Sequence, residues 1–174
     1  LGLTSFDVAI TMLPMSYTFG LSIINTHLHA GAKIVVTKFT TLQKEFWLHV
    51  ATRRITSLSG VPYSFEIMIK TGLLKKPLPY VQTITQAGGK LSSNLKLKLL
   101  DYCDEFQKSL FVMYGQTEAS PRISFVPPHN LRKKIDSIGV PVCGGSLEVL
   151  SEDGLRCGTT EQGEIIYRGP NVCL

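Results

Sequence analysis

The run from Met113 to Glu118 brings together residue types that suit a nucleotide phosphate and its magnesium ion. Apolar residues lead into Tyr114 and indicate the end of a buried strand, and Gly115 lets the backbone turn close to a ligand. The Thr117 hydroxyl can donate to a phosphate oxygen, and the Glu118 carboxylate can hold a hard cation. The run therefore predicts a phosphate and metal site, and the alternative is a strand-to-loop junction with a solvated glutamate.

The elements that would position this run alternate in type along residues 7–114. Short β-branched runs predict strands at 8–13, 33–37, 55–58, 81–85 and 110–114. Amphipathic runs predict helices at 20–30, at 41–53, from about Pro62 onward, and at 92–107 with a serine N-cap. This alternation is typical of an α/β fold, a mostly parallel β-sheet with flanking helices.

The chain changes character after Pro121. Residues 127–134 are expected to form a polar connector, and residues 146–150 and 163–168 are predicted β-segments with a turn at Asp153-Gly154. No helix is expected in this part. The chain is therefore divided into an α/β nucleotide-binding subdomain at 1–125 and the start of a β-rich subdomain at 135–174.

Glycine-rich or aromatic turns follow four of the predicted strands, at 14–20, 59–63, 86–90 and 115–118. Ligands of open parallel sheets bind beyond the carboxyl ends of the strands. Glycines permit close backbone approach, and aromatic side chains can wall an apolar pocket. These turns therefore predict one binding site along that edge of the sheet.

Composition narrows the class of protein. With 174 residues and 44% hydrophobic residues, the chain can bury one sizeable core. The net charge of +5 comes from scattered lysines and arginines without interleaved aromatics, which argues against nucleic-acid binding. Every apolar run is broken before a membrane span is complete, and no signal peptide is present. The four cysteines form no C-x-x-C pair, which disfavours a zinc site and favours reduced thiols in a cytoplasmic protein.

Five segments together resemble the adenylate-forming (AMP-binding) superfamily, which contains acyl-CoA and aryl-CoA synthetases, nonribosomal adenylation domains and luciferases. Residues 13–20 are similar to its L-P-x-x-[HY]-x-x-G motif, residues 87–91 to its adenine loop, and residues 114–118 to its Y-G-x-T-E motif. Residues 137–141 and 163–170 are similar to its two β-subdomain signatures. The resemblance runs in order over essentially the whole chain.

The resemblance implies roles for the residues that match these motifs. Thr117 and Glu118 are the implied catalytic residues, and Glu118 is the implied Mg²⁺ ligand. Tyr17, Phe19 and Gly20 are the implied acyl-pocket residues. The implied nucleotide-binding residues, with Tyr114 stacked on the adenine, are Gly88, Gly89, Lys90, Tyr114, Gly115, Gln116 and Thr117.

The resemblance also implies a reaction, that of an AMP-forming acyl-CoA synthetase. A carboxylate attacks the α-phosphate of ATP to give an acyl-adenylate and pyrophosphate, and the acyl group then passes to coenzyme A or to the phosphopantetheine of a carrier protein. Phe19, Leu21 and Ile24 favour a fatty or other apolar acid. The alternatives are an adenylation domain that loads a carrier protein and a noncatalytic nucleotide-binding scaffold of the same fold.

Not every motif of the superfamily is present in these residues. The phosphate loop, the ribose-binding aspartate and the catalytic lysine of the C-terminal domain have no counterpart. The chain is therefore expected to be a central fragment of the large N-terminal domain, inactive by itself.

Overall fold

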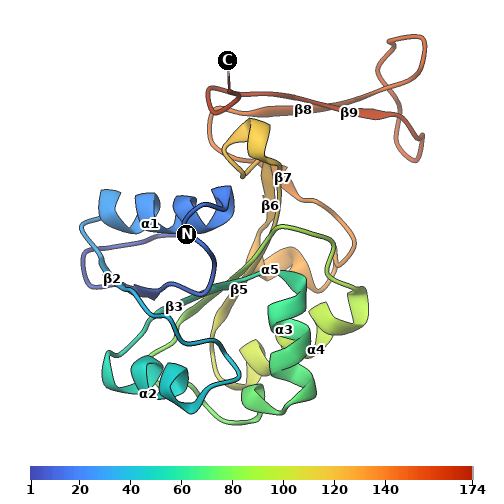
Figure 1. Ribbon diagram of the computed structural model, residues 1–174. Helices are drawn as coiled ribbons and strands as arrows, with labels where there is room; N and C mark the ends of the chain where they lie inside the picture. The colour runs from blue at the N-terminus through green and yellow to red at the C-terminus, as the bar shows by residue number, and fades with distance from the viewer. Residues whose placement is uncertain (174) are drawn as a thin grey trace.

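A seven-stranded sheet forms the centre of the molecule in the computed structural model, which describes residues 1–173 (Figure 1). Its strand order is β2-β1-β3-β4-β5-β6-β7. The first five strands pair in parallel, and β6 pairs antiparallel with both β5 and β7. The strands are β1 (Val8–Ile10), β2 (Lys33–Val35), β3 (Ser57–Gly60), β4 (Thr83–Gln86), β5 (Ser109–Tyr114), β6 (Ser124–Val126) and β7 (Val140–Pro141). The predicted α/β class with a mostly parallel sheet is confirmed.

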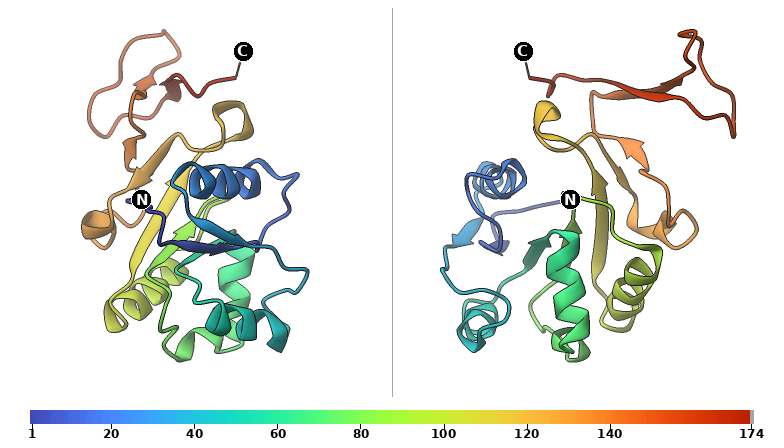
Figure 2. Two further views of the ribbon diagram at one scale, coloured as in Figure 1. Left: turned by 90° about the vertical axis from the view of Figure 1, so that its left-hand side faces the viewer. Right: turned by 45° about the vertical axis from the view of Figure 1, so that its right-hand side comes forward.

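Helices cover both faces of this sheet (Figure 2). On one face α1 (Thr18–His29) packs Phe19 and Ile23 against Ala9, Ala87 and Met113. The other face carries α2 (Lys44–Thr52), α3 (Pro62–Lys70) and α4 (Ser93–Glu105), whose apolar sides share a larger core with Ile10, Leu58, Ile84 and Leu110. Successive strand residues such as Ala9 and Ile10 thus serve opposite faces.

Local sequence signals account for where two of these helices begin. Pro62 occupies the first turn of α3, where its missing N–H leaves no hydrogen bond unmade. Ser92 is the N-cap of α4, and its side chain accepts a hydrogen bond from the Leu95 backbone N–H at 3.4 Å. The short 3₁₀ helices η1 (Leu73–Lys75) and η2 (Thr117–Ala119) complete the main body.

The polar connector predicted at 127–134 is wrong in part. Residues Pro128–Leu131 form α5, and Leu131 is fully buried in the larger core, so this segment is neither helix-free nor wholly polar. The first predicted strand is also too long, because β1 ends at Ile10 and residues 12–17 form the turn into α1.

A second, two-stranded antiparallel sheet stands away from the main body (Figures 1 and 2). It pairs β8 (Ser146–Leu150) with β9 (Glu164–Arg168), close to the predicted β-segments. The ladder of the large sheet runs on as far as Pro141. The division into subdomains at 1–125 and 135–174 stays a prediction.

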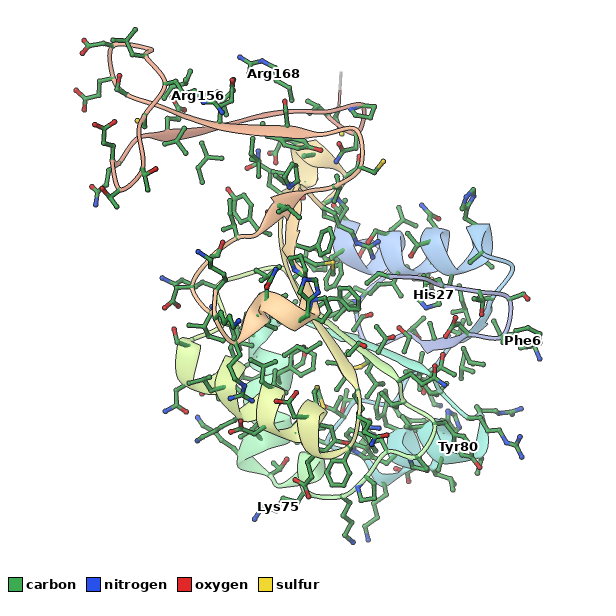
Figure 3. The ribbon with its side chains drawn as sticks, turned by 180° about the vertical axis from the view of Figure 1, so that it is seen from behind. Phe6, His27, Lys75, Tyr80, Arg156 and Arg168 are labelled. Atoms are coloured by element: carbon green, nitrogen blue, oxygen red, sulfur yellow. The ribbon has the colours of Figure 1, made fainter. Side chains whose placement is uncertain are left out.

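His27 and His29 differ in burial, as expected for residues two apart on α1. His27 lies on the side of α1 that faces the sheet (Figure 3). His27 is buried, with Nδ1 2.7 Å from the Ile23 carbonyl oxygen, whereas His29 is exposed. Within residues 1–173 no helix has the length and apolar character needed to cross a membrane.

Candidate functional site

The ends of β4 and β5 bracket a cavity of about 350 Å³. These strands are parallel neighbours, with Gln86 opposite Val112, so the turns that follow them emerge side by side. Gly88, Gly89 and Lys90 line one wall, and Tyr114 and Gly115 line the next. The structure thus brings together the two segments predicted to bind adenine.

The loop at Gly88-Gly89 has a conformation that only glycine adopts easily. Gly88 has φ +77° and Gly89 has φ +148°, both in the region that disfavours side chains. Gln86, only 1% exposed, donates from Nε2 to the Gly89 carbonyl oxygen at 3.0 Å. The buried amide fixes the loop before any ligand arrives, a role that the sequence analysis missed.

The far wall of the cavity is Asp136, Ser137 and Ile138. Ser137 and Ile138 begin one of the β-subdomain signatures, whereas Asp136 was not predicted to lie at the site. Lys96 on α4 holds this wall: its side chain is 5% exposed, Nζ donates to the Ile135 carbonyl, and Asp136 Oδ1 lies 3.5 Å away. The hydrogen bond from Ser93 and the charge of Lys96 lower the pKa of Asp136. The only feature of the sequence that could have indicated this role is a lysine, Lys96, among the apolar residues of α4.

The turn after β5 carries Thr117 and Glu118 at the surface. Gly115 is required there, because a Cβ atom would lie 1.8 Å from the Pro121 carbonyl oxygen. Thr117 and Glu118 are exposed in η2, as is Gln116 before it. The predicted phosphate-binding hydroxyl and carboxylate are therefore both accessible to a ligand.

Glu118 lines a second cavity of about 290 Å³ together with Gln116 and Tyr167. Among the described residues, no three His, Cys, Asp or Glu side chains converge to form a protein-only metal site. Mg²⁺ in nucleotide sites commonly takes one or two carboxylates and completes its shell with phosphates and water. The Glu118 carboxylate, with Glu164 lining the same cavity, fits that pattern.

The turn between β1 and α1 meets both nucleotide segments. The Tyr17 hydroxyl lies so close to Gly88 that a Cβ atom there would be 2.3 Å from it. The Thr18 hydroxyl donates to the Thr117 hydroxyl at 3.2 Å. Three motifs that are far apart in the sequence are therefore in contact.

Phe19 and Gly20 have explanations from packing. Phe19 is 1% exposed within the core under α1. A Cβ atom on Gly20 would lie 2.2 Å from the Pro14 carbonyl oxygen, so glycine lets α1 approach the preceding turn. The predicted acyl-pocket role of Tyr17, Phe19 and Gly20 stays a prediction.

Sequence comparison places these features among known proteins. The model of the family described as AMP-binding enzyme matches residues 2–174. A 2-succinylbenzoate–CoA ligase of Bacillus cereus is 28% identical, over 99% of this chain and 34% of that protein. The indoleacetate–CoA ligase of Aromatoleum aromaticum is 29% identical, over 98% of this chain and 33% of that protein. The chain thus spans about a third of the length of these relatives.

Solved structures agree with the sequence matches. The o-succinylbenzoate CoA synthetase of Bacillus subtilis, in complex with ATP and magnesium ion, gives a TM-score of 0.82 at 27% identity, covering 99% of this chain and 34% of that one. A long-chain-fatty-acid–CoA ligase from Archaeoglobus fulgidus gives 0.83 at 26% identity, covering 98% and 36%. With the family match extending over nearly every residue, the chain belongs to the AMP-binding enzyme family.

Proposed function

We propose that this chain is part of an AMP-forming acid–thiol ligase. The enzyme activates a carboxylic acid with ATP, releases pyrophosphate and transfers the acyl group to coenzyme A. The observation that carries this proposal is the contact of three motifs around the ends of β1, β4 and β5, beside a cavity large enough for a purine. Its named relatives are CoA ligases, which supports coenzyme A over a carrier protein as the acceptor.

Each residue of the site contacts a different part of the nucleotide, according to its position. Gly88, Gly89 and Lys90 form one wall for the adenine and Tyr114 offers its ring for stacking. Gly115 and Gln116 bring the chain to Thr117, whose hydroxyl donates to the α-phosphate.

Glu118 holds Mg²⁺, which when bound neutralises phosphate charge. Phosphoryl chemistry of this kind depends mainly on such positioning and charge neutralisation, and less on covalent participation by the protein.

The acid is proposed to have an apolar body. Two relatives act, by name, on 2-succinylbenzoate and indoleacetate, and a structural neighbour acts on long-chain fatty acids. Aromatic and aliphatic bodies both suit the partly exposed apolar side chains of the turn between β1 and α1, such as Tyr17. Tyr17 lies where the acid and the adenine loop would meet.

Acid-dependent exchange of labelled pyrophosphate into ATP tests this function in the whole protein that contains residues 1–174. We expect exchange with at least one aromatic or aliphatic acid and release of AMP that depends on coenzyme A. Glu118→Gln should abolish most exchange, and Glu152→Gln, on an exposed turn of the small sheet, is the matched control. Nucleotide binding without exchange for any acid would support the noncatalytic scaffold instead.

A further inference from the structure

The guanidinium group of Arg122 has no anionic partner among the described residues. Its Nε is buried without a hydrogen-bond partner, and none of the carboxylates in residues 1–173 forms an ion pair with it. Arg132 and Arg168 differ in this respect: Arg132 bonds Asp101 at 2.9 Å and Asp104 at 2.7 Å, and Arg168 pairs with Glu148. Arg122 is thus largely buried yet unpaired, while two exposed arginines are paired.

An unpaired buried charge weakens a fold unless a ligand compensates for it. Burial lowers the pKa of Arg122 because the charged form loses hydration. The guanidinium carbon lies 6.0 Å from the centre of the Phe19 ring. A cation–π contact at that distance is weak and does not replace a carboxylate.

The backbone of Arg122 is held firmly although its side chain is not. The Arg122 carbonyl oxygen accepts from Asn171 Nδ2 at 3.0 Å, and the next residue, Ile123, donates its N–H to the Tyr114 carbonyl at 2.9 Å. Gly115 lies directly against the Arg122 backbone. A rigid base therefore directs the side chain toward Phe19.

We propose that Arg122 binds a second anionic group, a carboxylate, on the acid that this enzyme activates. This inference rests on the proposed function and names its substrate class: an acid with an apolar or aromatic body and a carboxylate besides the one that is activated. The planar guanidinium matches a carboxylate with two parallel hydrogen bonds.

The test compares two acids that differ only in the second carboxylate, 2-succinylbenzoate and 4-oxo-4-phenylbutanoate, with octanedioate and octanoate as an aliphatic pair. Pyrophosphate exchange gives kcat/KM for each acid in the whole protein. We expect the wild type to prefer the diacid of at least one pair by tenfold or more, about 1.4 kcal/mol. Arg122→Met should bring that ratio close to one, and Arg122→Lys should give an intermediate value.

Two further measurements distinguish a role of Arg122 in acid specificity from a role in the stability of the fold. Arg132→Met, which removes an arginine that is already paired, should leave the diacid-to-monoacid ratio unchanged. Without ligand, Arg122→Met should melt at the same or a higher temperature than the wild type, because it removes an unpaired charge. A lower melting temperature with an unchanged ratio would assign Arg122 a structural role and overturn the proposal.

The remaining outcomes are also decisive. Equal use of both acids by the wild type, or a preference for the monoacids, overturns the inference while leaving the ligase function intact. A raised KM for ATP in Arg122→Met, with the acid ratio unchanged, assigns the guanidinium to a phosphate. Exchange with none of the acids tested, here or in the wider panel, overturns the proposed function itself.

Discussion

A double-mutant cycle between Gly88 and Tyr17 tests whether the adenine loop and the turn after β1 are in contact. An alanine at position 88 is disfavoured for two reasons, the backbone conformation and a steric overlap. Its φ of +77° costs roughly 1–2 kcal/mol for a residue with a side chain. Its Cβ would also lie 2.3 Å from the Tyr17 hydroxyl, an overlap that forces a shift worth about 1–3 kcal/mol.

The chain supplies a matched control for the first obstacle. Gly154 has nearly the same φ, +76°, and nothing lies within 4 Å of a Cβ built on it. Gly154→Ala should therefore lower the free energy of unfolding by no more than about 1–2 kcal/mol. Gly88→Ala should lower it by about 2–5 kcal/mol, the sum of the backbone and contact penalties.

Removing the hydroxyl separates the two penalties. Tyr17→Phe alone should change the free energy of unfolding by about 0.5 kcal/mol or less. In the Gly88→Ala background it should restore about 1–3 kcal/mol, because the closest remaining contact is then Val61 Cγ1 at 3.1 Å. Urea denaturation of the four proteins of the cycle, and of Gly154→Ala as the control, at one pH measures this coupling. Additive effects, or a Gly88→Ala penalty equal to that of Gly154→Ala, would refute the contact.

Three further outcomes are expected. Adenylation by Glu118→Asp should exceed that by Glu118→Gln, because Mg²⁺ requires an anionic oxygen; equal rates in exchange assays would contradict the metal role. Burial raises the pKa of the Cys103 thiol to about 12, so a maleimide at neutral pH should label exposed Cys143 and leave Cys103 unmodified until the protein unfolds. Partial burial acts to raise the pKa of Asp7, but hydrogen bonds from Thr4 and Thr56 outweigh it and lower the pKa overall. The ionised Asp7 therefore stabilises the folded protein at pH values above the pKa that it has in the unfolded chain, about 4. Asp7→Asn should destabilise the protein by up to ~1 kcal/mol at pH 7, with the difference from wild type lost as the pH falls below that value; a constant difference in denaturation experiments down to pH 3 would count against this.

The sequence was enough to predict the parallel part of the sheet. Its strands carry dense β-branched runs, and the helices between them have clear apolar stripes and local start signals such as Pro62 and Ser92. The antiparallel strands β6 and β7 were missed. They are three and two residues long, and β7 contains Pro141, so only pairing with neighbours defines them.

The candidate site likewise contains some residues that local sequence patterns predict and others that they do not. Gly88, Gly89 and Tyr114 belong to contiguous motifs that the sequence makes visible, and in the structure they line one cavity. Lys96 and Asp136 are forty residues apart, and no local pattern says that α4 reaches the segment before β7. Arg122 was overlooked because an arginine in a loop is ordinarily solvated, and its burial depends on the packing of α1.

The Gly115–Arg122 turn owes its shape to residues near the end of the chain. Asn171 Nδ2 donates to the Ala119 carbonyl oxygen at 2.6 Å as well as to that of Arg122, and the Cys173 N–H donates to the Glu118 carbonyl oxygen at 2.8 Å. These bonds close loops of about fifty residues, so the entropy of closing the chain must be overcome before they form. During synthesis the parallel sheet can assemble while this segment is still in the ribosome. The turn that carries the hydroxyl, the carboxylate and the guanidinium therefore obtains these bonds only after residues 171–173 have been synthesised.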